Sequence, residues 1–258
     1  MAAPVRVLAE RAPLDREDLS LDAAASHHVA RVLRARRGDA LVVFDGDGCE
    51  RDATIVEVRQ ERKAIVVRLR LEGEPRSGVV ADSARVHVLQ ALAKGDKLER
   101  VVRACAELGA AAVWPVQCER SVAKLDTHRA EAQRAHLSAI SASASEQCGR
   151  ADLLQVLPVL TLGEAVQRAA TVASLRCVAD ETGGASAAEW LAASGASEGP
   201  VALLVGPEGG LADDERALAH RAGFSSITLG PRILRTEHAG AAFCAIASAI
   251  LGDLKRRG

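Results

Sequence analysis

A glycine-rich turn between a strand and a helix constrains the fold of this chain more than any other feature. Residues 201–205 form a run of five apolar residues, and the sequence Gly-Pro-Glu-Gly-Gly at 206–210, here the glycine turn, closes it. A short apolar run that ends at glycines is typical of a buried strand followed by a turn. Acidic residues at 213–215 then favour the start of a helix. This order predicts an α/β sheet with a ligand crevice at the carboxyl ends of its strands.

A second strand and turn follow closely. Residues 226–229 are predicted to form a strand, Gly230 and Pro231 a turn, and Thr236 the cap of a final helix. That helix, residues 239–251, is apolar or small on every side, which predicts burial all round. It is shorter than the roughly 18 residues that a membrane span needs. We therefore expect a core or interface helix, no membrane association, and a homodimer that buries the helix.

The remainder of the chain divides into two regions with different patterns of predicted secondary structure. Up to about residue 73, short strands separated by turn residues predict a small barrel, with a hairpin turn at Asp45-Gly46-Asp47-Gly48. From residue 85 onward strands and helices alternate, which predicts a parallel sheet with helices on both faces. The polar stretch 72–83 is predicted to be a linker. We expect two domains, at residues 1–73 and 82–258.

The composition narrows the possible functions. The chain has 258 residues, 48% hydrophobic and 26% charged, which is typical of a globular protein. Its net charge of -1 means that any RNA site must be a local basic patch. Aromatic residues make up 2%, too few for a face that stacks single-stranded bases. The six cysteines have no metal-ligand spacing and no secretory signal is visible, so we expect free thiols, no metal and a cytoplasmic protein.

The two turns carry a resemblance to a known family. GPEGGLADDE (206–215) and LGPRILRTEHA (229–239) resemble the signature of the RsmE family, the 16S ribosomal RNA uridine-N3 methyltransferases of the SPOUT superfamily. The resemblance extends upstream to QALAKGDKLERVVRACAELG, CERSVAK and SEQCGR, and with weaker matches near the N-terminus it covers nearly the whole chain. The family usually has Arg-Thr-Glu-Thr-Ala where this chain has His238 in place of the second threonine.

The resemblance implies a fold, a cofactor and a partner. The fold is a SPOUT-type parallel sheet with a C-terminal trefoil knot, together with a small N-terminal PUA-like RNA-binding β-barrel. The cofactor is S-adenosyl-L-methionine, and the partner is 16S ribosomal RNA or the small ribosomal subunit. Connection rules alone would not predict a knot, because threaded chains are very rare. The absence of the G-x-G-x-x-G and P-loop patterns also argues against NAD chemistry and nucleotide hydrolysis.

The family match also implies which residues hold the methyl donor. Backbone groups at the ends of the two strands would bind the adenine, and the glycines would let the methionyl part lie close. The predicted cofactor-binding residues are Leu204, Val205, Gly206, Glu208, Gly209, Gly210, Leu229, Gly230, Ile233, Leu234 and Thr236.

Methylation of uridine N3 requires that the nitrogen lose its proton, so the site needs a base or a cation that favours the anion. Arg232 and Arg235 are the candidates for stabilising the developing negative charge. Glu237 is a candidate base or simply a helix-start residue, since a helix N-terminus stabilises its carboxylate. An imidazole suits proton transfer near neutrality, but His238 departs from the family. The base therefore stays open.

The RNA-binding candidates are cations at turns and helix ends, because arginine and lysine bind phosphate oxygens. The alternative for each is an ordinary solvated side chain. The predicted RNA-binding residues are Arg31, Arg34, Arg36, Arg37, Lys94, Lys97, Arg120, Lys124 and Arg150. Two further functions stay open: methylation of a ribose 2′-hydroxyl or a tRNA base by a related SPOUT enzyme, and a non-catalytic RNA-binding role in ribosome assembly.

Overall fold

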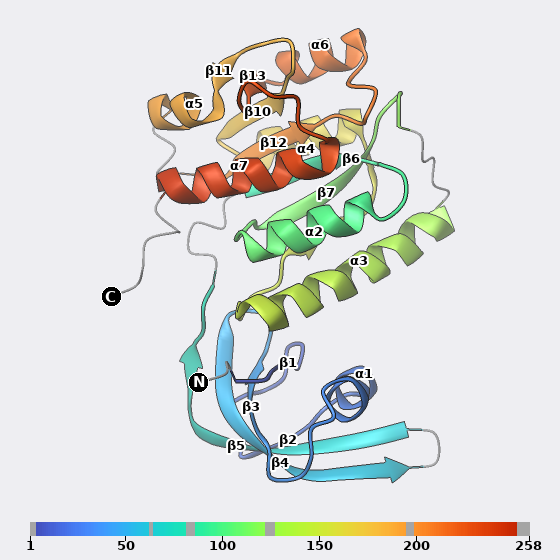
Figure 1. Cartoon of the computed structure of the whole chain (residues 1–258), viewed down its shortest axis with the longest axis vertical. Helices are drawn as coiled ribbons and strands as arrows, with labels where there is room; N and C mark the ends of the chain where they lie inside the picture. The colour runs from blue at the N-terminus through green and yellow to red at the C-terminus, as the bar shows by residue number, and fades with distance from the viewer. Residues whose placement is uncertain (1–3, 62–63, 81–85, 122–126, 195–198, 252–258) are drawn as a thin grey trace. The chain divides into compact units, whose positions relative to one another are not determined.

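The computed structural model describes residues 4–61, 64–80, 86–121, 127–194 and 199–251 (Figure 1). The chain separates into two compact units, one of residues 1–80 with 142–153 and one of residues 81–141 with 154–258. Each unit contains its own sheet. The division into domains at residues 1–73 and 82–258 remains a prediction. The sequence analysis did not assign residues 142–153 to the first unit.

The first unit contains a five-stranded sheet in the order β1-β3-β4-β5-β2. The strands are β1 (Arg6–Leu8), β2 (Asp18–Ser20), β3 (Ala40–Phe44), β4 (Cys49–Glu61) and β5 (Ala64–Ser77), with the short helix α1 (Ala23–His27) and the π-helix η1 (His28–Val32) between β2 and β3. The predicted turn lies between β3 and β4, where the Asp45 carboxylate accepts bonds from the amides of Asp47 and Cys49 at 2.8 and 2.9 Å. β5 runs to Ser77, so the start of the predicted linker is part of the sheet.

The second unit contains a sheet of eight strands, all paired in parallel, in the order β11-β13-β10-β12-β6-β7-β8, with β9 also on β7. The strands are β6 (Val86–Ala91), β7 (Ala112–Gln117), β8 (Gln155–Val156), β9 (Leu160–Thr161), β10 (Leu175–Ala179), β11 (Ala185–Ser186), β12 (Val201–Val205) and β13 (Ser225–Thr228). All five residues of β12 are buried. A strand covered on both faces needs such an unbroken apolar run. The predicted α/β parallel sheet is confirmed.

Helices cover both faces of this sheet. The helices of the second unit are α2 (Lys97–Glu107), α4 (Leu162–Val172), α5 (Ala187–Ala193), α6 (Asp213–Arg221) and α7 (Thr236–Leu251). Helix α3 (Thr127–Cys148) begins in this unit and ends in the first. α2 and α7 run side by side over one face (Figure 1), where Gly240 of α7 packs against Val88 of β6. Leu89, the next residue of β6, belongs to the core on the opposite face, with Leu162 and Val166 of α4. In the described ranges, no helix has the length and apolar character needed to cross a membrane.

Pro115 lies inside β7, although proline cannot donate a ladder hydrogen bond. One side of β7 pairs with β6 along its length. The other side pairs with β8 only at residues 112–113 and with β9 only at 116–117. Pro115 therefore lies where no strand pairs on that side, which explains why the strand tolerates it.

The last helix was predicted to be buried all round. The buried residues of α7, including Ala239, Phe243 and Ala247, lie on one side. The opposite side stays partly or fully exposed in the single chain, as at Ala245 and Ala249. The sheet and its neighbouring helices therefore bury one side of α7 in a single chain, and burial of the other side at an interface stays a prediction.

All six cysteines are free thiols, and four of them are buried: Cys105, Cys118, Cys177 and Cys244. Burial raises the pKa of the Cys118 thiol to about 12. A thiol so rarely ionised is a poor nucleophile. These side chains act as small apolar core groups.

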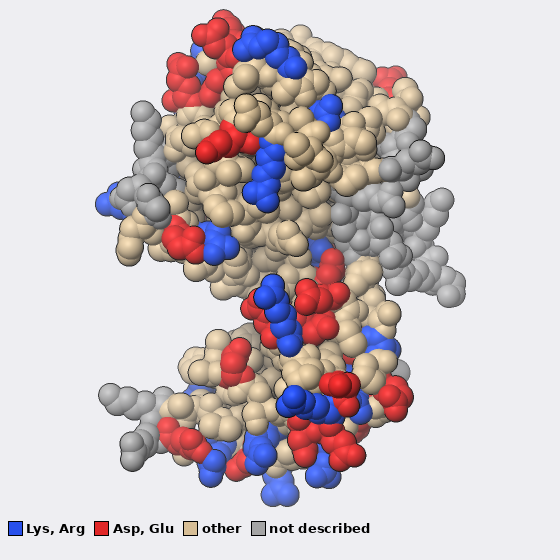
Figure 2. Space-filling view, turned by 180° about the vertical axis from the view of Figure 1, so that it is seen from behind, with Lys and Arg blue, Asp and Glu red and all other residues tan. Residues whose placement is uncertain are grey.

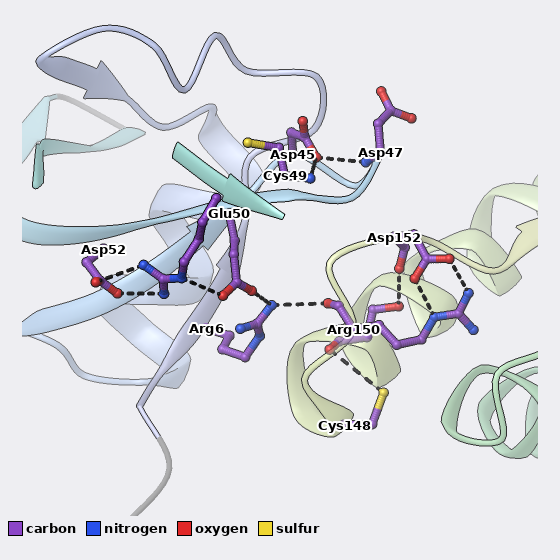
Figure 3. Close-up of polar contacts among 11 residues, drawn as sticks. Arg6, Asp45, Asp47, Cys49, Glu50, Asp52, Cys148, Arg150 and Asp152 are labelled. Atoms are coloured by element: carbon purple, nitrogen blue, oxygen red, sulfur yellow. Dashed lines mark hydrogen bonds and ion pairs between the residues drawn. The ribbon is translucent and has the colours of Figure 1, made fainter. Parts of the chain in front are cut away.

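The end of α3 and the residues after it belong to the first unit through buried polar contacts (Figure 3). The Glu146 carboxylate accepts a hydrogen bond from the amide of Leu8 at 3.0 Å. Arg6 pairs with Glu50 at 2.8 Å and donates to the carbonyl of Arg150 at 3.3 Å. Arg150 itself is 5% exposed and pairs with Asp152 at 2.8 Å. The SEQCGR segment therefore ties residues 142–153 into the first unit.

We expect Glu146→Ala to destabilise the first unit by about 1–3 kcal/mol, because the partly buried amide of Leu8 loses its acceptor. The measurements are urea unfolding and the hydrogen-exchange rate of the Leu8 amide. Glu131→Ala is the matched control on the same helix, since Glu131 is 62% exposed and pairs only with Arg134 in the contacts described. Equal unfolding midpoints for the two variants would contradict the role of Glu146.

Candidate functional site

A cavity of about 480 Å³ opens at the carboxyl ends of β10, β12 and β13. Residues 178–181 after β10, the glycine turn after β12, and residues 228–237 after β13 contribute most of its walls. Lys97 of α2 and Arg216 of α6 complete them. Parallel strands end at one edge of a sheet, so the loops after them converge there. The crevice lies where the two turns of the sequence predict it.

Two hydrogen bonds of Thr236 connect the second turn to the glycine turn and to β6. The Thr236 hydroxyl donates to the carbonyl of Gly206 at 2.7 Å and accepts from Gln90 Nε2 at 2.8 Å. Gln90 is 1% exposed and Thr236 8%. Thr236 was predicted to cap α7, but it is the first residue of that helix and its hydroxyl binds the glycine turn instead. Gln90 was missed, although a lone glutamine in an apolar strand is a visible signal.

The glycine turn has a backbone that requires glycine at one position. Gly210 has φ +69°, and its amide donates to the carbonyl of Pro207 at 2.9 Å. Left-handed φ values are costly for residues with a Cβ atom. Gly209 does not have such a φ and does not line the cavity. A Cβ built on Gly209 would lie 3.6 Å from the Cβ of Arg120, an ordinary contact.

Two carboxylates share one cation at the cavity wall. Lys97 Nζ lies 2.7 Å from Glu208 Oε1 and 3.8 Å from Glu237 Oε2. The hydrogen bond from Lys97 lowers the pKa of the Glu208 carboxyl. Glu237 is 4% exposed, and its Oε2 has no hydrogen-bond partner among the residues described. A buried carboxylate without a donor retains the capacity to accept a hydrogen bond.

Asp180, at the end of β10, forms a second charged group in the cavity wall. Both of its oxygens accept from Arg216 Nη1 at 2.8 Å, and Ser226 donates to it at 3.1 Å. Burial raises the pKa of Asp180, but hydrogen bonds from Thr182, Arg216 and Ser226 outweigh that effect and lower the pKa to about 2. Asp180 was not predicted as a site residue, because the nearest glycines, Gly183 and Gly184, do not follow β10 directly as they follow β12.

The predicted site residues separate into those that line the cavity and those that do not. The three catalytic candidates, Arg232, Arg235 and Glu237, all line it. Of the predicted cofactor-binding residues, all except Leu204 and Gly209 line it as well. Leu204 is fully buried in the core beneath. Their contacts with a donor stay a prediction.

The predicted RNA-binding residues are scattered. Arg31, Arg34, Arg36 and Arg37 are exposed, as is Lys94. Arg150 is buried against Asp152, a place that does not favour contact with a phosphate. Lys97 and Arg120 are bonded to the glycine turn instead. Lys124 lies outside the described residues.

Two further observations concern the distribution of surface charge and the possibility of a metal site. On the face shown in Figure 2, acidic and basic side chains of the first unit are interleaved, not gathered by sign. Any basic area for RNA on this face is therefore small. Within the part of the chain that the structure describes, no group of three or more His, Cys, Asp and Glu side chains is placed to hold a metal ion.

We expect Asp180→Asn to lower stability by about 2 kcal/mol at pH 7, the value of a shift from 3.8 to about 2. The lowered pKa in the folded state stabilises the protein above pH 3.8, and this stabilisation is lost as the pH falls through about 2. Urea unfolding of both proteins between pH 7 and 2.5 measures the difference, which should shrink toward acid. A difference that does not change with pH would contradict this account.

Comparison with known proteins identifies the family. Residues 81–248 match the family described as RNA methyltransferase domain, and residues 21–69 match the RNA methyltransferase PUA domain. The chain is 31% identical to ribosomal RNA small subunit methyltransferase E of Bacillus subtilis, over 83% of this chain and 82% of that protein. It is 33% identical to the protein of the same name from Mycobacterium bovis, over 86% and 82%.

Solved structures agree. A methyltransferase from Legionella pneumophila in complex with the bound cofactor SAM has a TM-score of 0.85, at 30% identity over 96% of this chain and 98% of that one. Ribosomal RNA small subunit methyltransferase E from Neisseria gonorrhoeae, bound to S-adenosyl methionine, has a TM-score of 0.80, at 27% identity over 98% and 100%. The resemblance carried by the two turns is thereby confirmed: this chain belongs to the ribosomal RNA small subunit methyltransferase E family.

Proposed function

We propose that this protein transfers the methyl group of S-adenosyl-L-methionine to N3 of a uridine in 16S ribosomal RNA. The observation that carries the proposal is the cavity at the ends of β10, β12 and β13, in a family whose relatives were solved with this donor. The N-terminal match to a PUA domain supports RNA as the substrate. Because that substrate is ribosomal RNA, we also propose a cytoplasmic location.

We further propose the finer fold of the family, a SPOUT sheet with a trefoil knot and a PUA-like barrel. Support for the knot comes from the return of the chain after β13. Residues 228–237 line the same cavity as the glycine turn, and the Thr236 hydroxyl binds the carbonyl of Gly206. Support for the barrel comes from the long antiparallel pair β4 and β5 and the PUA match.

The chemistry asks the protein to orient the reactants and to stabilise charge. The donor supplies an electrophilic methyl group, and uridine N3 must lose its proton before it attacks. Arg232 and Arg235 are exposed side chains in the cavity wall, so they are free to face a uridine that enters from solvent. Guanidinium groups keep their charge and attract the uridine anion as it develops. Buried Glu237 is the remaining candidate base.

Mass spectrometry of digested 16S ribosomal RNA tests the proposed reaction. Small subunits lacking the modification are incubated with the protein and S-adenosyl-L-methionine. We expect 3-methyluridine at one position. A 2′-O-methyl nucleoside, or methylation of tRNA only, would favour the related SPOUT activities. Donor binding without any methylated nucleoside would favour an assembly factor.

We expect Arg235→Ala to lower turnover by about a hundredfold to a thousandfold at saturating donor and RNA, with little effect on donor affinity. The reason is that attraction to the fixed cation grows only as uridine becomes anionic. Arg103→Ala, an exposed arginine of α2 outside the cavity wall, is the control. Turnover within about threefold of the parent would remove Arg235 from catalysis and leave a phosphate contact.

We also propose a homodimer that covers the exposed side of α7. This side presents small and apolar residues, among them Ala245, Ala249 and Ile250, and Ile250 is 38% exposed. An apolar helix face left open in one chain favours a second surface against it. We expect light scattering to give a dimer, and Ala245→Glu to give a monomer. Ala170→Glu, at an exposed position of α4, should stay dimeric; a monomeric parent would refute the proposal.

A further inference from the structure

Two cations that the sequence analysis assigned to RNA are bonded to the glycine turn. Lys97 Nζ donates to Glu208 Oε1 at 2.7 Å, and Arg120 Nη1 donates to the carbonyl of Gly209 at 3.0 Å. The partners are 111 and 89 residues apart in the chain. These bonds therefore connect α2 and the loop after β7 to the turn after β12.

A further contact joins the loop after β7 to the same region. The amide of Glu119 donates to Glu215 Oε1 at 2.8 Å, and Glu215 Oε2 accepts from the amide of Ala212 at 3.0 Å. Gly209 packs against Arg120, since a Cβ on Gly209 would lie within 3.7 Å of two carbons of that side chain. The CERS segment, residues 118–121, thus contacts the glycine turn and the start of α6.

The turn needs such contacts because of its composition. Glycine has the most conformational freedom to lose on ordering. A binding loop that is already held in its bound shape avoids that loss when the ligand arrives. Thr236 holds the first residue of the turn from below. Lys97 and Arg120 hold the next part, Glu208 and Gly209, from the sides.

Lys97 is poorly placed to serve RNA as well. To bind a phosphate it would leave Glu208, and the buried carboxylate of Glu237, 3.8 Å away, would lose its nearby cation. A buried carboxylate is costly without a compensating charge. Lys94, three residues earlier, has an exposed side chain and carries no such constraint.

We propose that Lys97 and Arg120 are positioning residues for the methyl donor, holding the glycine turn in its binding shape, and do not contact RNA phosphate. The inference rests on the proposed donor site. It gives a role to one residue in each of the segments QALAKGDKLER and CERSVAK, namely Lys97 and Arg120.

The test compares Lys97→Met and Arg120→Met with Lys94→Met and Arg103→Met, which change exposed cations nearby. Calorimetry measures donor affinity, and filter binding across salt concentrations measures RNA affinity. We expect the first two variants to weaken donor binding about tenfold, through loss of a charge-assisted hydrogen bond. Their RNA salt dependence should match the parent, and the controls should bind donor normally.

If Lys97 and Arg120 instead contact RNA phosphate, their variants would show the opposite pattern of donor and RNA affinities. The slope of RNA affinity against salt would fall by about one, and donor affinity would stay within about twofold of the parent. That result would overturn the inference. A double-mutant cycle with Glu208→Gln adds a check on Lys97: the double variant should bind donor no worse than either single one. Additive losses would show that Lys97 acts elsewhere.

A structural readout separates this inference from the proposed function. If the parent protein does not bind S-adenosyl-L-methionine, the proposed function fails, and hydrogen exchange in the free full-length chain decides the inference alone. We expect faster exchange of the amides at 208–210 in Lys97→Met and Arg120→Met, while exchange of the β12 amides stays as in the parent. Exchange equal to that of Lys94→Met would overturn it.

Discussion

The hydrogen bonds of Thr236 are the interaction on which the candidate site depends. Its hydroxyl binds the carbonyl of Gly206 and the amide of Gln90, and so joins the ends of β12, β6 and the start of α7. A hydroxyl can donate one bond and accept others, which lets a single buried side chain satisfy both partners. Because Gln90 and Thr236 are both buried, breaking the bond between them leaves a buried polar atom unpaired. The two turns therefore keep a fixed relation.

The cavity above these bonds combines a rigid floor with charged walls. β12 is buried along its whole length, so the turn that follows starts from a fixed point. The walls carry two paired groups, Lys97 with Glu208 and Asp180 with Arg216. Arg232 and Arg235 in the same wall stay exposed. Paired charges hold the shape of the cavity, and exposed cations are available to a substrate that becomes anionic.

The first unit depends on a different set of contacts. Its fold combines residues from two distant parts of the chain. Arg6, Glu50 and Arg150 meet although they are separated by up to 144 positions. A charge pair of this kind is stable away from water only when hydrogen bonds complete it. The SEQCGR segment, which had no chemistry visible in the sequence, is therefore a structural element of the first unit.

The sequence by itself determined the local elements and the place of the cavity. The apolar run at 201–205 is typical of a strand buried on both faces, and the glycines after it are typical of a turn. The parallel sheet followed from the alternation of strands and helices. The family followed from the two turns. Each of these depends on neighbours in the chain, so periodicity and turn residues reveal them.

Only the tertiary structure decided the partners of the charged groups. Sequence patterns placed Lys97 and Arg120 on a surface for RNA, yet each is bonded to groups brought near by folding. Asp180 and Gln90 entered the site in the same way. Arg150 was assigned to RNA as well, but it is buried and pairs with its near neighbour Asp152. The sequence pattern around a charged side chain does not reveal its bonding partner, because that partner can follow a different strand, far away in the chain. Which loops lie next to each other depends on the order of the strands, and that order is a property of the whole sheet.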